Sequence, residues 1–170
     1  MKLKVGITGQ SGFMGTHLAN SIRYRPAEIE IVPFEDEFFN KDERLKQFAL
    51  QCDCIVHLAA MNRTKGKPEE IYEINIGLVK QLIRVLEESR HTPHVIFSSS
   101  TQQEKDNLYG RSKREGRMLL EEWASRNKAP FTGMVIPNVF GPFGVPHFNS
   151  VVLTFCYQVT HGIEPAIDVD

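Results

Sequence analysis

A glycine-rich turn near the amino terminus constrains this chain more than any other feature. The segment TGQSGFMG places Gly9, Gly12 and Gly15 between an apolar run, LKVGIT, and a segment with helical spacing. Small residues here allow a tight turn, close approach of a pyrophosphate to the backbone, and packing of the helix on the strand. A turn that merely needs one glycine at positive φ is the alternative, but the position directly after a first strand favours a dinucleotide site. The predicted contact residues are Gly9, Gln10, Ser11, Gly12, Phe13, Met14 and Gly15.

Short apolar strands alternate with helical segments along the rest of the chain. Strands are expected at residues 3–8, 28–34, 54–60 and 94–100, and a further strand with its exit turn at 131–141; helices are expected at 13–24, 42–50, 68–90, 109–127 and 149–160. Asp42 is expected to cap the second helix. The apolar stripe of the third helix is expected to comprise Ile71, Ile74, Leu78, Leu82, Val85 and Leu86. This alternation predicts an α/β fold, a Rossmann-type doubly wound parallel sheet with helices on both faces.

Composition excludes several classes of function. The 170 residues suit one domain, and a formal net charge of -1 gives no general attraction to nucleic acid or to anionic membranes. The start has no signal-peptide layout and no apolar run is long enough to span a bilayer, so we expect a cytoplasmic protein. Three cysteines without a ligand-like spacing indicate reduced thiols and no metal site. The last residues, IEPAIDVD, read as the approach to another strand, so we expect residues 1–170 to be the amino-terminal part of a larger protein.

An acidic stretch ends the second predicted strand. Phe34, Glu35 and Asp36 stand about 20 residues after the last glycine, where an acid binds the adenosine ribose hydroxyls in dinucleotide sites. Such an acid repels a 2′-phosphate, so Glu35 favours NAD. The alternative is that these acids only open a polar loop.

Three further residues fit a proton-transfer site. Tyr109 and Lys113 are four residues apart, which places them on one face of a helix. The lysine cation and the helix amino terminus are expected to lower the pKa of the tyrosine, allowing it to give a proton to a carbonyl oxygen. Ser100 would hydrogen-bond the same oxygen. Only eight residues separate Ser100 from Tyr109, but βα connections commonly take about 2–6 residues, so the gap suffices.

The motifs TGQSGFMG, HLAA (57–60), FSSS (97–100), YGRSK (109–113) and PNVFGP (137–142), with Asn75, together resemble the extended short-chain dehydrogenase/reductase family, whose members act mostly on nucleotide sugars. The resemblance implies that Ser100, Tyr109 and Lys113 are catalytic. It implies cofactor contacts from Leu58, Ala59, Ala60, Asn75, Ser98, Tyr109, Lys113 and Pro137. On the substrate side it implies Ser100, Asn138, His147 and Asn149.

The short serine-to-tyrosine interval and the stretch PNVFGPFGVPHFNSVVLTFCYQV are similar to the bacterial capsular-polysaccharide reductases of the UDP-N-acetyl-L-fucosamine pathway. Those proteins join a reductase domain to a carboxy-terminal cupin domain. The similarity implies NADP, in contrast to Glu35, and a nucleotide-sugar partner. The chain departs from the family pattern at Val135, where many members have arginine.

The expected function is therefore NAD(P)H-dependent reduction of a 4-keto UDP-sugar for capsule or surface polysaccharide, by a homodimer that binds neither nucleic acid nor membrane. A UDP-sugar 4-epimerase or dehydratase and a non-catalytic NAD(P)-binding sensor are the alternatives. The residues after Ser100 lack the acid pair of a dehydratase, and a sensor would lose Tyr109 or Lys113. Residues 1–170 alone are expected to be poorly active. His57 and Trp123 are interpreted as packed residues.

Overall fold

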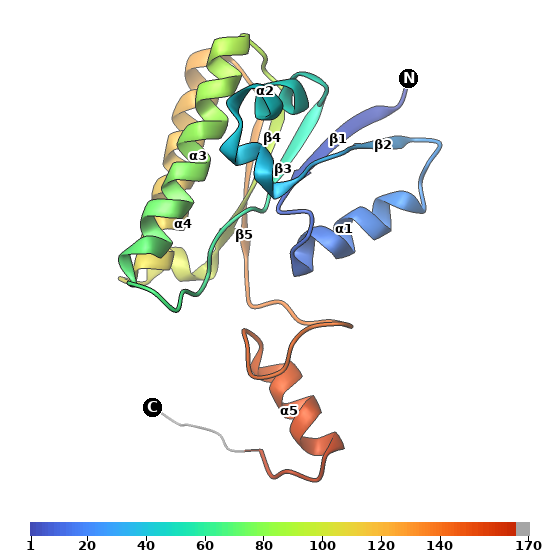
Figure 1. The fold of residues 1–170 in the computed structure, drawn as a ribbon, viewed down its shortest axis with the longest axis vertical. Coiled ribbons are helices and arrows are strands. Elements are labelled where there is room, and N and C mark those ends of the chain that lie inside the picture. The colour runs from blue at the N-terminus through green and yellow to red at the C-terminus, as the bar shows by residue number, and fades with distance from the viewer. Residues whose placement is uncertain (166–170) are drawn as a thin grey trace. The chain divides into compact units, whose positions relative to one another are not determined.

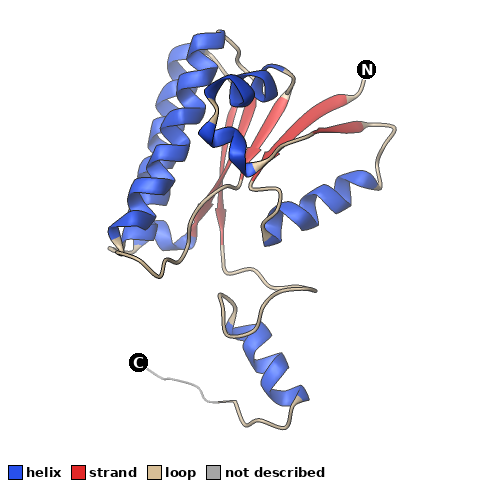
Figure 2. Cartoon of the chain, viewed as in Figure 1, coloured by secondary structure: helices blue, strands red, loops and turns tan. Residues whose placement is uncertain are grey.

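The protein is described by a computed structural model in which residues 1–165 can be placed (Figure 1). The chain divides into two compact units, Met1–Val135 and Ile136–Asp170. The strands are β1 (Leu3–Thr8), β2 (Ile29–Val32), β3 (Cys54–His57), β4 (His94–Ser100) and β5 (Phe131–Ile136). The α-helices are α1 (Phe13–Arg23), α2 (Asp42–Leu50), α3 (Glu69–Ser89), α4 (Leu108–Asn127) and α5 (Val151–Thr160), and short 3-10 helices occupy Asp36–Asn40 (η1) and Thr101–Glu104 (η2) (Figure 2).

The five strands form one sheet in the order β2-β1-β3-β4-β5. The pairs β1–β2, β1–β3 and β3–β4 are parallel, which confirms the expected fold class. From β1 the chain moves outward to β2 on one side and then to β3 on the other. In sheets of this kind ligands bind at such a reversal, outside the carboxyl ends of the strands. Here those ends are Thr8 of β1 and His57 of β3, which are register partners.

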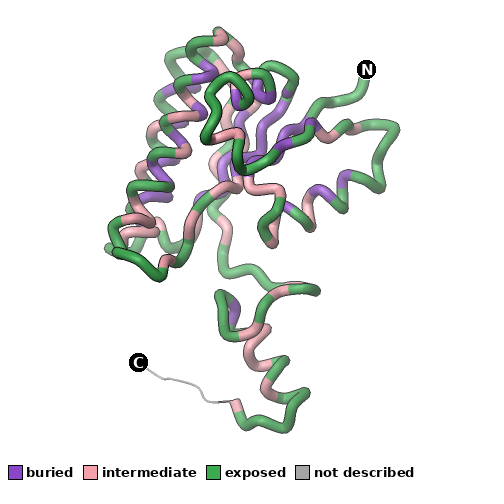
Figure 3. The backbone as a smooth tube through the Cα atoms, in the orientation of Figure 1, coloured by how far each residue is buried: buried purple, intermediate pink, exposed green. Residues whose placement is uncertain are grey.

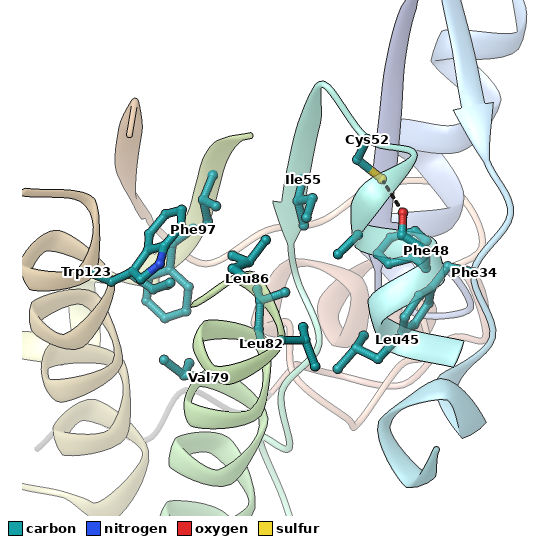
Figure 4. Packing of buried hydrophobic residues seen from close by; sticks show 14 of the residues in the cluster. Phe34, Leu45, Phe48, Cys52, Ile55, Val79, Leu82, Leu86, Phe97 and Trp123 are labelled. Carbon is teal, nitrogen blue, oxygen red and sulfur yellow. Dashed lines mark hydrogen bonds between the residues drawn. The ribbon is translucent and has the colours of Figure 1, made fainter. Parts of the chain in front are cut away.

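Two hydrophobic layers cover the sheet. On one face α1 packs against Val5 and Ile7 of β1. On the other face α2, α3 and α4 bury a larger cluster that includes Phe48, Leu82 and Trp123 (Figure 4). Buried residues are therefore concentrated along the strands and the inward faces of these helices (Figure 3). The packed position expected for Trp123 is confirmed, since none of its surface is exposed.

Several local expectations were wrong. Strands β2 and β3 are shorter than the apolar runs that predicted them. Lys41, not Asp42, occupies the N-cap position of α2. Asp42 instead accepts hydrogen bonds from Gln81 and Arg84 of α3, and these bonds lower its pKa. The carboxylate therefore ties two helices together rather than capping one.

The buried stripe of α3 also differs from the expected one. Ile76 and Val79 are buried, whereas Ile74 is 40% exposed. Helix α3 packs against α2 and α4 as well as the sheet, so the face it buries is set by three neighbours. Asn75 is buried on this face because its side chain has its own partners, described below.

The second unit is small and is described by itself. Its helix α5 begins after Ser150, whose hydroxyl accepts a hydrogen bond from the Leu153 N–H at 3.3 Å. No residue of α5 is buried. Among residues 1–165, no helix has both the length and the apolar character needed to cross a bilayer.

Candidate active site

The glycine turn joins β1 to α1 at the strand-order reversal. Gly9 has φ +69°, a left-handed conformation that favours glycine. A Cβ on Gly9 would lie 2.8 Å from the Ala59 backbone nitrogen, and a Cβ on Gly15 would lie 2.7 Å from the Gln10 Cα and closer still to the Gly9 oxygen. Gly12 is the N-cap of α1 and supplies no side-chain cap. The helix amino terminus is therefore left to backbone N–H groups, the arrangement that suits a phosphate.

The other turn residues lie between the end of β1 and the first turn of α1. Phe13 and Met14 are the first residues of α1 and are half-buried. The Gln10 Oε1 atom is buried without a hydrogen-bond partner among the described residues. The Ser11 hydroxyl points outward from the turn and donates to Asp36 at 2.7 Å. The turn is thus connected to the end of β2.

A pocket lies at this connection. It has a volume of about 380 Å³ and is lined by residues from the turn and from the end of β2: Ser11, Phe34, Glu35, Asp36 and Glu37. Three carboxylates and no basic side chain line it, which suits ribose hydroxyls better than a phosphate. The sequence singled out Glu35, but Asp36 is the acid bonded to the glycine turn.

Ser100 and Tyr109 are brought together by the short segment between β4 and α4. Ser100 is the last residue of β4, and Tyr109 is the second residue of α4. The Ser100 side chain lies close enough to the Tyr109 hydroxyl to lower the pKa of the phenol. The segment between them is compact because η2 folds back on the start of α4, where a Cβ on Gly110 would lie 2.9 Å from the Lys105 oxygen and nearer to that of Gln102.

The pKa of Tyr109 moves in the direction opposite to the one expected from sequence. Burial raises it above its ordinary value, and the nearby Ser100 side chain only partly opposes this effect. The expectation relied on Lys113, whose Nζ lies 5.7 Å from the centroid of the Tyr109 ring. That ammonium group donates instead to the Ser98 carbonyl oxygen at 2.8 Å. Its charge therefore does not stabilise the tyrosinate directly.

Lys113 is a buried cation that has no carboxylate partner among residues 1–165. Its side chain is 4% exposed, and burial lowers its pKa to about 8. Besides the Ser98 carbonyl, Nζ lies 3.4 Å from the Ser98 hydroxyl and 5.1 Å from the centroid of the Phe97 ring. A long ammonium side chain buried with so few acceptors is well placed to bind the hydroxyl oxygens of a ligand.

Asn75 connects three parts of the site. Its Oδ1 accepts from the Met61 N–H at 2.7 Å, and its Nδ2 donates to the Met61 oxygen at 2.9 Å and to the Ser112 hydroxyl at 3.0 Å. The Ser112 hydroxyl donates in turn to the Tyr109 carbonyl oxygen. Asn75 thus holds the segment after Ala59 and Ala60 against the first turn of α4, in agreement with a supporting role.

The remaining predicted residues fall into two groups, one in the same unit as the glycine turn and one in the second unit. Leu58 and Ala59 directly follow β3 beside Gly9, and Ser98 is buried within β4. Pro137, Asn138, His147 and Asn149 are exposed and belong to the second compact unit. Their contacts with a cofactor or substrate remain a prediction.

Sequence reasoning missed two contributors. Gly110 is required by the close approach of η2, and its signal was the glycine directly after Tyr109 in the first turn of a helix. Thr8 was also missed. It is fully buried, bonds His57 at 2.7 Å and accepts from the Ala59 N–H at 3.3 Å. Its only signal was a hydroxyl at the end of an apolar strand.

Comparisons with known proteins agree with this geometry. A sequence profile described as "NAD dependent epimerase/dehydratase family" matches residues 5–167. A UDP-2-acetamido-2,6-beta-L-arabino-hexul-4-ose reductase from Pseudomonas aeruginosa is 35% identical over 161 residues, which cover 95% of this chain and 42% of the relative. The chain therefore spans less than half the length of that curated protein.

Solved structures show the same fold. The capsular polysaccharide assembling protein CapF from Staphylococcus aureus has a TM-score of 0.76 and 30% identity, over 98% of this chain and 43% of CapF. RMD from Pseudomonas aeruginosa, solved with NADPH, has a TM-score of 0.79 over 95% of this chain and 63% of RMD. Its identity of 19% makes this a likeness of fold alone. With the glycine turn in place and a profile match along nearly the whole sequence, the chain belongs to the NAD dependent epimerase/dehydratase family.

Proposed function

We propose that this chain is the dinucleotide-binding part of an NAD(P)H-dependent reductase that acts on the 4-keto group of a UDP-sugar, in the synthesis of capsule or another surface polysaccharide. The observation that carries the proposal is the grouping of Ser100, Tyr109 and Lys113 on β4 and α4 of the unit that carries the glycine turn. The substrate class comes from the 35% identical relative, which reduces a hexul-4-ose nucleotide.

The residues fit a nicotinamide dinucleotide. The pyrophosphate would lie against the N–H groups between Gly9 and Gly15, where any larger side chain would block its approach. The adenosine ribose would enter the pocket lined by Ser11 and Asp36. Ala59 and Ala60 follow β3 beside the turn, and Lys113 would bind the hydroxyls of the nicotinamide ribose. Carboxylates on the ribose pocket favour NAD, whereas the resemblance to capsular reductases favours NADP.

In the proposed reaction Tyr109 is the acid. A bound NAD(P)H supplies the hydride that adds to the carbonyl carbon. Tyr109 gives its proton to the carbonyl oxygen, and Ser100 donates a hydrogen bond to that oxygen and orients it. The raised pKa of Tyr109 keeps the phenol protonated at neutral pH, which is the form that a reduction needs. In this role Lys113 would bind the ribose hydroxyls and would not act on the tyrosinate directly.

Residues of the second unit would complete the substrate site, and Asn138, His147 and Asn149 are the predicted contacts. We expect residues 1–170 alone to turn over poorly and the whole protein, with a further substrate lobe and a cupin domain, to be a homodimer. Sedimentation of the full-length protein would test the dimer.

Substituting Tyr109 by phenylalanine tests the reaction. We expect Tyr109→Phe to retain binding of NADH or NADPH, because the glycine turn, Lys113 and the aromatic ring at position 109 are all kept and only the hydroxyl is lost. In the full-length protein, turnover of a 4-keto UDP-sugar, followed by loss of absorbance of the reduced nicotinamide, should fall by at least about a hundredfold on this substitution. Equal turnover by both proteins would refute the assignment of Tyr109.

A 4-epimerase of the same family is the alternative that the fold allows. An epimerase retains its nicotinamide and consumes none, so net oxidation of added NADH or NADPH separates the two reactions. A dehydratase is disfavoured because η2, directly after Ser100, begins with Thr101, Gln102 and Gln103 rather than with an acid pair. A sensor would bind the dinucleotide and show no turnover in the full-length protein.

A further inference from the structure

A chain of buried contacts connects the glycine turn to Lys113. It begins at the Ala59 N–H, which lies against Gly9 and donates to the Thr8 hydroxyl oxygen at 3.3 Å. The Thr8 Oγ1 is 2.7 Å from the Nδ1 of His57. Thr8 and His57 have almost no exposed surface, so water does not compete for these bonds.

The second half of the chain runs through the backbone of His57. Its carbonyl oxygen accepts from the Ser98 hydroxyl at 3.1 Å. The Ser98 carbonyl then accepts from Lys113 at 2.8 Å. The imidazole is also stacked on the Phe97 ring, with centroids 5.8 Å apart, and Lys113 lies over that same ring. Thr8, His57 and Phe97 are cross-strand neighbours on β1, β3 and β4.

The direction of the Thr8–His57 bond follows from the available partners. The Ala59 N–H donates to Thr8, so the threonine oxygen already accepts one bond. Its own proton has one acceptor among the hydrogen bonds of the described residues, the Nδ1 of His57. The imidazole is therefore neutral with its proton on Nε2, an atom that is buried without a partner in the same part of the chain.

A charged imidazole is disfavoured at this place. Burial, and to a smaller extent the nearby Lys113 charge, lower the pKa of His57 to about 3. A buried ring with one orphaned nitrogen would be replaced at no loss by an apolar side chain if packing were its whole role. The bond to Thr8 is what an apolar side chain cannot supply.

We propose that Thr8 and His57 form a positioning pair that holds the glycine turn and Lys113 in one fixed frame, so that both halves of a dinucleotide are bound at once. The pair touches no reacting atom. It acts through Ala59 at one end and through Ser98 and Lys113 at the other. This inference rests on the proposed function, because it takes the ligand to be a nicotinamide dinucleotide.

The test compares ligands that occupy one half or both halves of the site. ADP contacts the turn and the ribose pocket only, whereas NADH or NADPH also reaches Lys113. Thr8→Val removes the hydroxyl at nearly constant volume, and Thr8→Ser keeps it. Val85→Ala, in the core face of α3, is the control for general loss of stability, because its apolar side chain takes no part in these hydrogen bonds.

Of NADH and NADPH, the one that the unchanged chain binds more tightly is used. We expect Thr8→Val to weaken the binding of this dinucleotide about tenfold, the loss expected for one buried hydrogen bond, and to weaken the binding of ADP by less than about twofold. Thr8→Ser and Val85→Ala should each bind both ligands within about twofold of the unchanged chain. An equal loss for ADP and the dinucleotide would show that Thr8 only supports the turn, and no loss for either would show no positioning role. Both results overturn the proposal.

Two further measurements keep the inference testable if Thr8→Val does not fold. Nitrogen-15 spectra of the unchanged chain should show an unprotonated Nδ1 and a protonated Nε2 on His57 at pH 6, and the reverse tautomer would refute the argument. His57→Gln keeps an acceptor for Thr8 and should retain dinucleotide affinity better than His57→Leu, and equal loss in the two would count against it. If the unchanged chain binds neither ADP nor a reduced dinucleotide, the proposed function fails, although the tautomer result stands separately.

Discussion

Replacing Gly110 by alanine should displace the short connection that brings Ser100 to Tyr109. A Cβ at this position would stand 2.9 Å from the Lys105 oxygen and 3.0 Å from the Gln102 carbonyl carbon, with the Gln102 oxygen nearer still. These are backbone atoms, so no side chain can rotate away. Relief requires η2 to move off α4 or the first turn of α4 to distort, and overpacking of this kind costs about 1–3 kcal/mol.

Gly77 offers a matched control on the neighbouring helix. It lies within α3, is exposed, and an added Cβ would meet nothing within 4 Å. Gly77→Ala should therefore raise the free energy of unfolding by about 0.4–1 kcal/mol, through helix propensity and reduced freedom of the unfolded chain. The same substitution thus has opposite signs at two helical glycines.

Urea unfolding of the two variants measures these free energies directly. Displacement of η2 should also move Ser100 away from the Tyr109 hydroxyl and remove its pKa-lowering effect, so the phenol of Gly110→Ala should titrate at a higher pH than that of the unchanged chain in an ultraviolet titration. Equal stability of Gly110→Ala and the unchanged chain, with an unaltered tyrosine titration, would refute the argument that close backbone packing fixes this interval.

Three other predictions follow from the site. Gly15→Ala should abolish NADH and NADPH binding in a fluorescence titration, because its Cβ would overlap the turn backbone; retained affinity would contradict the role of the turn. Lys113→Met should raise the free energy of unfolding by about 1–3 kcal/mol at pH 7 and weaken dinucleotide binding, since a buried cation is removed together with its ligand contact; lower stability would contradict this. The pKa of His57 is about 3 in the fold and 6.5 as its ordinary value, so the unfolded chain binds the extra proton between these values. The contribution of neutral, buried His57 to the free energy of unfolding is therefore complete above pH 6.5. It is lost as the pH falls toward 3, by at most about 1.4 kcal/mol per pH unit. Urea unfolding at several pH values should show this loss in the unchanged chain and not in His57→Gln.

The order of strands and helices could be predicted from sequence because it depends on periodicity and on turn residues. The glycine turn predicted where β1 ends and α1 begins, and the alternation of strands and helices predicted the parallel sheet. The periodicity could not predict which face of α3 is buried. Ile74 and Ile76 are the same residue type two positions apart, yet Ile76 is buried and Ile74 is exposed, and the neighbouring elements decide which of them is covered. The side chain of Asp42 found partners on another helix for the same reason. These outcomes depend on tertiary contacts.

The spacing of residues in the sequence also could not predict the electrostatics of the site. The i and i+4 positions of Tyr109 and Lys113 correctly placed them on one face, with Nζ 5.7 Å from the ring centroid. The sign of the pKa shift of Tyr109 depends instead on how deeply the phenol is buried and on which acceptor Lys113 finds. The acceptor is the Ser98 carbonyl, two residues before Ser100, and a pattern of residue types does not identify a backbone atom.

Hydrogen bonds hold the short segment between Ser100 and Tyr109 in a defined conformation. At its start the Ser99 hydroxyl donates to the Gln103 side chain at 2.6 Å, and at its end the Asn107 side chain accepts from the Gly110 N–H at 2.7 Å. Between these points Arg114 of α4 donates to the Gln103 carbonyl at 2.9 Å. A segment tied at both ends and in its middle has few conformations to lose when a ligand binds, so little ordering entropy opposes the alignment of Ser100 with Tyr109. A longer loop would reach the same distance, but it would lose that advantage. The brevity of the interval therefore favours catalysis by pre-organisation.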